Sequence, residues 1–320
     1  MSQSVLRLPS KVFESNLPKL LDLLSSHDRS DNKVFLDFCS VAYWIPAAVV
    51  FTCAIVDRWV KRGRVVSFTN HLSSDACRYL QRIDFFEQLG FILPEPFERH
   101  DPRTAFVEIQ RVEPGVARLK DPLAGRLAAC LAGTTDMQDE AVLFAEFSLG
   151  EVMANSQQHA NATGFVSGQY VHSRSWSRIG IADCGVGIRE SFRLAGSPHF
   201  REDMSHAQAL QKALEPWVSS KNHLRTGPYG EPPNRGMGLS MIGHMLAASG
   251  GEFFICSGDA WVHRRGSAPA TAGSLRHEMP STVVSLLFDR GQISDFRGLV
   301  VEANRALNLT EERSGENLFE

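Results

Sequence analysis

The sequence has no long apolar run, no N-terminal signal segment and little excess charge. Its longest apolar run, IPAAVVFTCAIV at 45–56, is too short to span a bilayer and is typical of a buried helix. The start, MSQSVLRLPSKVFESN, lacks the apolar core of a signal peptide. A net charge of -3 gives no general attraction to nucleic acid or anionic membranes, so any phosphate site has to be local. We therefore expect a cytoplasmic protein that binds neither membranes nor nucleic acid.

Paired cysteine motifs are absent as well, because none of the six cysteines stands in a CxxC pattern. Most of them lie in apolar stretches, which indicates reduced, buried thiols rather than disulfides or zinc ligands. The six are Cys39, Cys53, Cys77, Cys130, Cys184 and Cys256.

The composition, with 43% hydrophobic and 22% charged residues, is that of an ordinary globular protein, and 320 residues suffice for about two domains. The first part alternates between strand and helix patterns, which predicts a small α/β domain over residues 1–112. The patterns are a strand at 33–38, a helix at 46–63, a strand at 64–70, a helix at 74–91 and a strand at 105–112.

The second part indicates a different architecture, a layer of helices on a mostly antiparallel sheet. We assign this α+β sandwich to residues 113–290, with a polar, mobile loop at 263–280 and a C-terminal helix with a polar tail at 291–320. The patterns are helices at 115–132 and 138–160, a hairpin at 164–184, a helix at 236–249 and strands at 251–258 and 281–288.

The helix predicted at 138–160 carries polar side chains in a row. Glu151, Asn155 and His159 are spaced at i, i+4 and i+8, so they share one face of the helix. Because other residues between them can pack inward, an acid, an amide and an imidazole in one row indicate a face that serves a site rather than the core.

Three motifs with glycine or threonine follow this helix. IADCGVGI ends a strand, NRGMGLSMI begins a helix and PSTVVSLLF begins the last strand. Each alone is more typical of a turn or an irregular helix start than of a site. The residues they contribute are Asp183, Gly185, Gly187, Gly236, Gly238 and Thr282.

The order of these features is more specific than any one of them. Taken in order, these features resemble the GHKL ATPase superfamily. They are E-x-x-x-N on a helix, D-x-G-x-G after a strand, a long polar loop, G-x-G-L at a helix start and a threonine at the start of the last strand. Its nucleotide-binding fold is shared by DNA gyrase, histidine kinases and the MutL mismatch-repair proteins. The resemblance covers about residues 113–290 and implies a Bergerat-type sandwich that binds ATP and Mg²⁺.

The resemblance implies roles that the chemistry of each residue supports. Asn155 would hold Mg²⁺ through its side-chain oxygen. Asp183, with Thr282 beside it, would accept a hydrogen bond from the adenine amino group. Gly185 and Gly187 would let the backbone approach the nucleotide without a clash at Cβ.

The phosphate end of the nucleotide is implied to lie at the next helix. Gly236 and Gly238 would present backbone N–H groups to the phosphates at the helix N-terminus. The loop at about 196–235 would be the ATP lid, and its basic residues could reach the γ-phosphate. These residues are Lys221, Arg225 and Arg235.

Glu151 stands where hydrolysing members of the superfamily keep the general base for water. A base must lie within hydrogen-bond reach of its water, and helical spacing from Asn155 allows this. The alternative is a solvated surface acid. For His159 we favour a structural role at the helix end, where an imidazole is stabilised by the helix dipole.

The N-terminal part is similar to a STAS domain, the fold of anti-anti-sigma factors, over 33–70 and 78–91. In those proteins a partner kinase phosphorylates a Ser or Thr at the start of the helix after the second strand. That region here is YWIPAAVV, and Thr52 lies farther into the helix, so we expect no phosphoswitch. The domain is expected to dock a partner or to regulate.

Three functions stay open at this point. The first is Mg²⁺-dependent ATP hydrolysis in which lid closure is coupled to partner binding or self-association, in a bacterial-type regulatory pathway. The second is an anti-sigma-type serine/threonine protein kinase acting on a STAS partner, and the third is an ATP-gated binding module with negligible turnover. A histidine autokinase is not expected, because no helical hairpin carries an acceptor histidine.

Overall fold

The computed structural model describes residues 4–28, 33–72, 74–95, 97–98, 106–114, 120–134, 136–160, 162–219 and 238–307. The N-terminal segment, residues 4–95, holds β1 (Ser4–Arg7), β2 (Lys11–Val12), α1 (Leu17–Ser25), β3 (Val34–Asp37), β4 (Tyr43–Trp44), α2 (Pro46–Lys61), β5 (Val66–Thr69), α3 (Asp75–Arg82) and α4 (Phe85–Gln88). After it come β6 (Phe106–Val112), α5 (Lys120–Ala132), α6 (Glu140–Asn155), β7 (Gly164–Val171), β8 (Trp176–Asp183), α7 (Gly187–Leu194), α8 (His206–Ala213), α9 (Gly238–Ala248), β9 (Glu252–Arg265), β10 (Thr271–Asp289) and α10 (Phe296–Ala306).

The N-terminal segment contains a parallel sheet with strand order β1-β3-β5. Helices α1 and α2 connect its strands, as the alternating patterns predict. α2 begins at the buried Pro46, where the missing backbone N–H interrupts no helical hydrogen bond. The segment is thus an α/β unit, while its likeness to a STAS domain stays a prediction.

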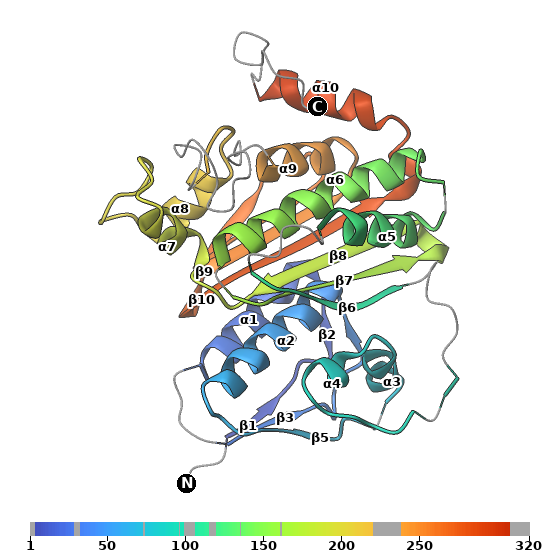
Figure 1. Ribbon diagram of the computed structural model, residues 1–320, viewed down its shortest axis with the longest axis vertical. Helices are drawn as coiled ribbons and strands as arrows, with labels where there is room; N and C mark the ends of the chain where they lie inside the picture. The colour runs from blue at the N-terminus through green and yellow to red at the C-terminus, as the bar shows by residue number, and fades with distance from the viewer. Residues whose placement is uncertain are drawn as a thin grey trace.

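The second part folds around a five-stranded sheet in the order β6-β7-β8-β10-β9, and every neighbouring pair is antiparallel. Figure 1 shows α5, α6 and α9 together on one face of this sheet. A helical layer on an antiparallel sheet gives the α+β architecture expected from the sequence.

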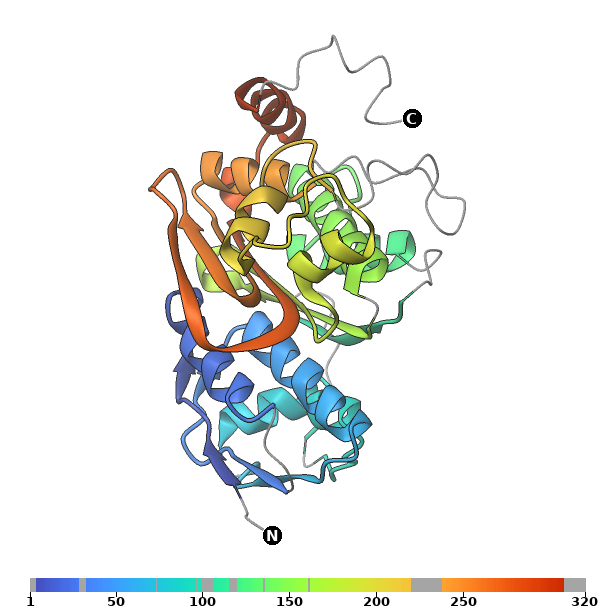
Figure 2. The same ribbon diagram turned by 90° about the vertical axis from the view of Figure 1, so that its left-hand side faces the viewer.

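Both parts share one stack of layers (Figures 1 and 2). α1 and α2 lie against the second face of the five-stranded sheet, with the parallel sheet below them. At the closest approach, Gly180 of β8 meets the start of α2, and a Cβ there would collide with the backbone of Ala47. Because sheets cover α2 on both sides, the helix is apolar around most of its circumference.

Two element boundaries differ from the sequence prediction. β6, which the boundary at 112 assigns to the first domain, hydrogen-bonds to β7 and belongs to the five-stranded sheet. The single helix predicted at 74–91 consists of α3 and α4, because Asp84 adopts a left-handed conformation with φ 65° between them.

The mobile loop predicted at 263–280 is wrong. β9 and β10 continue through much of this stretch as a long hairpin, orange in Figure 2. Gly273 pairs with Trp261 and lies so close to its indole that a Cβ would collide with the ring. Met279 is fully buried where the strand register shifts. Backbone pairing and these contacts order a stretch whose polar composition favours a loop.

The described cysteines agree largely with the expectation of buried thiols. Four are free and buried: Cys53, Cys77, Cys184 and Cys256. Cys39 is free but exposed, and the side chain of Cys130 lies outside the described part. Within the described ranges, no helix is long and apolar enough to cross a membrane.

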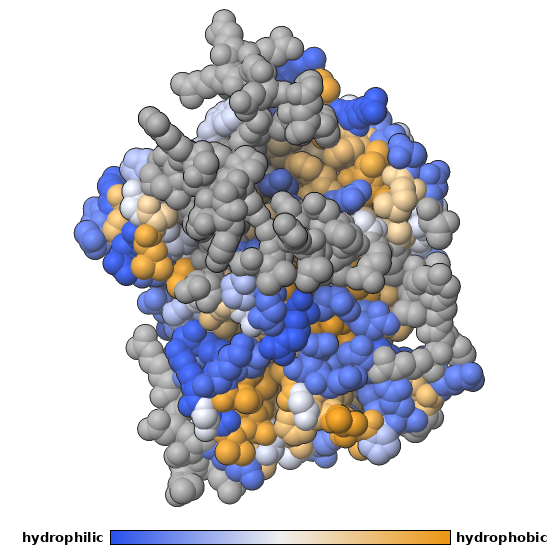
Figure 3. Space-filling model, in the orientation of Figure 1, coloured by the Kyte–Doolittle hydropathy of each residue, from blue (hydrophilic) through white to orange (hydrophobic). Residues whose placement is uncertain are grey.

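Apolar side chains reach the surface of the N-terminal segment. Figure 3 shows apolar atoms gathered on the lower part of the face in view, below the five-stranded sheet. The large apolar residues exposed in the N-terminal segment are Val5, Phe13, Val60, Val65, Leu72 and Ile92.

Candidate functional site

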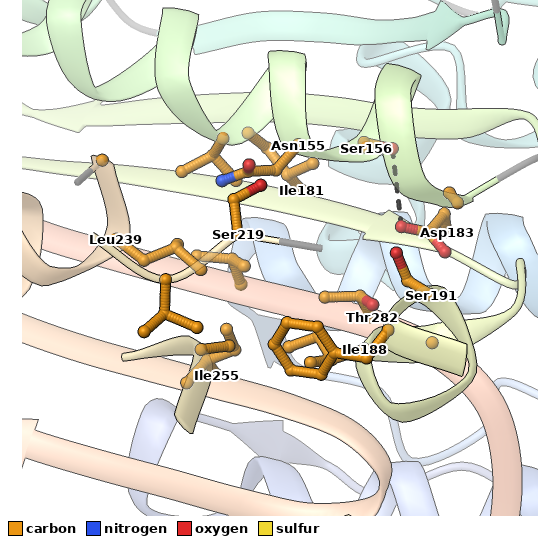
Figure 4. A pocket seen from close by; sticks show the side chains of 18 residues that line it. Asn155, Ser156, Ile181, Asp183, Ile188, Ser191, Ser219, Leu239, Ile255 and Thr282 are labelled. Atoms are coloured by element: carbon orange, nitrogen blue, oxygen red, sulfur yellow. Dashed lines mark hydrogen bonds between the residues drawn. The ribbon is translucent and has the colours of Figure 1, made fainter. Parts of the chain in front are cut away.

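A cavity lies between the helical layer and the five-stranded sheet, and it encloses about 800 Å³ of space that is partly open to solvent. α6, α7, α9 and the strands β8, β9 and β10 all contribute to its walls, which Figure 4 shows from close by. Most lining side chains are apolar. Five residues predicted from the sequence are among those that line it: Asn155, Asp183, Gly187, Gly238 and Thr282.

Asp183, the last residue of β8, is the buried acid of this cavity, with 2% of its surface exposed. Its carboxylate accepts hydrogen bonds from the Gly185 N–H at 3.0 Å and from the Ser156 hydroxyl at 3.4 Å (Figure 4). Burial raises the pKa of Asp183 to about 7, although these bonds and the backbone N–H of Thr282 act in the opposite direction. A carboxyl group with such a pKa in a cavity is typical of a functional site.

Three neighbouring strands fix the surroundings of Asp183. Thr282 of β10 stands directly opposite Asp183, and its hydroxyl lies 3.5 Å from that of Ser257 on β9. Ser257 accepts a hydrogen bond from the Ile188 N–H at 2.8 Å, which holds the first turn of α7. Gly187 begins that turn with φ +74°, a conformation that favours glycine.

The helix predicted at 138–160 ends in a π-helical turn, which is wider than an α-helical turn. α6 stops at Asn155, and Ser156–Ala160 form a π-helical turn. Glu151 and Asn155 keep the predicted α-helical spacing, and the extension of that row to His159, which lies in the π-helical turn, stays a prediction. The side chain of His159 lies outside the described part.

The π-helical turn joins α6 to the base of the cavity. It places the Ser156 hydroxyl on Asp183 and the Ala160 carbonyl against Gly185, where a Cβ would collide with it. Gly185 is therefore required for close backbone packing beside the cavity rather than as a lining residue.

Asn155 lines the cavity on the α6 side, and its amide points toward Ser219 in Figure 4. Glu151, one turn earlier, is not among the residues that line the cavity. Its carboxylate lies against Gly238, the first residue of α9, where a Cβ would collide with it. The helix dipole favours a carboxylate there, so this contact brings together the predicted base and a predicted phosphate-binding glycine.

Sequence analysis missed part of the cavity wall. The missed residues include Ile188, Ser191, Phe192, Val218 and Ser219. The first three follow the D-x-G-x-G motif at i, i+3 and i+4, so their helical spacing could have indicated a common face toward the site. Val218 and Ser219 offer no comparable pattern.

Some predicted residues fall outside the described part of the chain and stay predictions. These are Gly236 and the basic residues Lys221, Arg225 and Arg235. The lid predicted at about 196–235 is described only up to Ser219, a part that includes α8, and its remainder lies outside the described residues.

Comparison with known proteins gave no match, either to a protein-family model or to a curated protein. The function therefore has to be argued from the cavity and its residues.

Proposed function

We propose that the protein binds ATP with Mg²⁺ in this cavity, as a GHKL-type protein with a STAS-like N-terminal domain, and hydrolyses the nucleotide slowly. Lid closure would be coupled to binding of a partner protein or to self-association. One observation carries the proposal: Asn155, Asp183, Gly238 and Thr282, from segments far apart in the sequence, line a single cavity.

The base end of the nucleotide is supported by the chemistry of Asp183. The cavity has mostly apolar walls, which suit a flat heterocycle. An ionised carboxylate is a hydrogen-bond acceptor only, and the adenine amino group is a donor. Ionised Asp183 would thus select adenine over a base that presents an acceptor at that position.

The metal fits the residues around the phosphate end. Mg²⁺ prefers hard oxygen ligands and keeps several water and phosphate oxygens, so one amide oxygen from Asn155 is a sufficient protein contribution. Within the described residues, no group of three or more His, Cys, Asp or Glu side chains could hold a metal ion. When bound, Mg²⁺ neutralises phosphate charge.

Glu151 is the proposed general base for water. Its carboxylate lies at the start of α9, beside the backbone that the proposal assigns to the phosphates. A base beside these backbone groups could take a proton from a water that attacks the γ-phosphate. The lid residues Lys221, Arg225 and Arg235 would add positive charge there.

The test is ATP binding and phosphate release with Mg²⁺, measured on the wild type beside Asp183→Asn and Glu151→Ala. Asp183→Asn should lose ATP binding. Glu151→Ala should bind ATP but release phosphate about 100-fold more slowly. Glu146→Ala is the matched control, because Glu146 lies on the same helix but its carboxylate faces Gly125 of α5. A wild type that binds no ATP would rule out the proposal.

Transfer of phosphate to a protein hydroxyl is the second candidate, since water and hydroxyl nucleophiles need the same positioning. The N-terminal segment is an unsuitable acceptor in cis. The start of α2 is buried against β8 and carries Pro46, Ala47 and Ala48 instead of a hydroxyl residue. A kinase would therefore act on another molecule, and ATP bound without turnover would favour either this function or an ATP-gated module.

A further inference from the structure

The loop between β8 and α7 is held from two sides. On one side, the Val186 N–H donates to the Ala160 carbonyl at 3.0 Å. On the other side, Nη1 of Arg58, from α2 in the N-terminal segment, donates to the Cys184 carbonyl at 3.0 Å. The second contact crosses from one part of the molecule to the other and reaches the residue next to Asp183.

The Cys184 carbonyl belongs to the same peptide unit as the Gly185 N–H. That unit is planar and trans, so its C=O and N–H groups point in opposite directions. Arg58 binds the oxygen, and the N–H donates to Oδ1 of Asp183 at 3.0 Å. A guanidinium on the carbonyl both orients the peptide and polarises it, which strengthens the hydrogen bond to the carboxylate.

Asp28 fixes Arg58 in this position. Its two carboxylate oxygens accept from Nε and Nη2 of Arg58 at 3.2 and 3.4 Å, and Oδ1 also accepts from the Trp59 indole at 3.2 Å. The Asp28 side chain is 6% exposed and that of Arg58 is 17% exposed. An Arg fork can hold Asp28 and the Cys184 carbonyl together, whereas a single ammonium group cannot reproduce this geometry.

We propose that Arg58 is a positioning residue for the nucleotide base, which fixes through the 184–185 peptide the carboxylate of Asp183 that receives the adenine amino group. The inference rests on the proposed ATP site. It makes the N-terminal segment part of adenine recognition, although it lies on the face of the sheet opposite the cavity. A change in how α2 sits on the sheet would then alter nucleotide affinity.

The test compares ATP with purine riboside triphosphate, which lacks the amino group, by measuring both dissociation constants for each variant. In the wild type ATP should bind more tightly. In Arg58→Met this preference should fall about tenfold, because a hydrogen bond to a charged group is lost from the chain that holds Asp183. In Arg58→Lys the preference for ATP should also fall, but by a smaller factor.

Arg62→Met is the matched control. Arg62 also contacts Asp28, at 3.0 Å, but its only described partner there is that carboxylate and not the 184–185 peptide. Its preference for ATP should equal that of the wild type. If Arg58→Met and Arg58→Lys keep the wild-type preference, or if both nucleotides weaken equally, Arg58 is structural and the inference is wrong. If the wild type itself fails to prefer ATP, the role of Asp183 in the proposed function fails first.

Discussion

The two faces of the five-stranded sheet come from alternate residues of the same strands, yet they are built for different purposes. On β8, Ile179, Ile181 and Asp183 belong to the side of α6, α9 and the cavity. Between them, Gly180 and Ala182 face α2. Small residues let a helix backbone approach the sheet closely, whereas larger ones hold the opposite helices away and border a cavity. The face toward α2 is therefore specified for permanent contact with the N-terminal segment.

Polar contacts on the α2 side support the same conclusion. Glu14 and Arg178 form an ion pair at 3.1 Å with side chains 3% and 8% exposed. Ser285 of β10 also donates to Glu14, at 3.4 Å. This pair and the Ser285 hydroxyl link the N-terminal segment to β8 and β10 through polar groups whose geometry fits the observed arrangement.

We expect the largest effect from Gly180→Val, which changes the face of the sheet toward α2. The new Cβ would collide with the backbone of α2, which cannot move without opening the layers. We expect a loss of about 4 kcal/mol in the free energy of unfolding, or no folded protein, by chemical denaturation. Gly150→Ala is the control: Gly150 lies within α6 with open space at its Cβ, so this change should stabilise by about 0.5 kcal/mol. Similar stability of Gly180→Val and the wild type would mean that α2 is not a fixed layer.

On the cavity face, Asp183→Asn should have the opposite effect on stability to that of Gly180→Val. The pKa of Asp183 rises on folding from 3.8 to about 7, so the folded state binds the proton more tightly. Stability is therefore lost as pH rises through that window, by at most about 4 kcal/mol once the carboxyl is ionised above pH 7. Asparagine keeps an acceptor for Gly185 and carries no charge. The variant should be more stable than the wild type at pH 8, and the difference should shrink toward pH 4.

Thermal unfolding of both proteins across this pH range measures the effect. Asp203→Asn serves as the control for the loss of a carboxylate, because the side chain of Asp203 is exposed. If Asp183→Asn gains nothing at pH 8, burial is not what raises the pKa. If the variant gains stability at pH 8 and also loses ATP binding, Asp183 lowers the stability of the protein and is needed for its function.

The sequence predicted local elements of the fold better than contacts between distant segments. Local spacing sufficed for the strands around Asp183 and Thr282, because period-two alternation and glycine motifs are encoded within a few residues. It did not predict that Arg58 reaches the Cys184 carbonyl, since that contact joins residues 126 positions apart. The π-helical turn after Asn155 was missed for a related reason: tertiary contacts of Ser156 and Ala160 override the α-helical pattern.

We expect the smallest effect from Thr52→Val, a substitution inside α2. Thr52 is fully buried in α2, and its hydroxyl donates to the Ala48 carbonyl of the same helix at 2.8 Å. Valine keeps the shape and loses a local hydrogen bond, so the free energy of unfolding should change by less than about 1 kcal/mol. Phosphate incorporated into the protein from labelled ATP should also stay unchanged. Incorporation that disappears in Thr52→Val would instead require α2 to leave the sheet and expose this hydroxyl, which would contradict the permanent layer that the small residues of β8 imply.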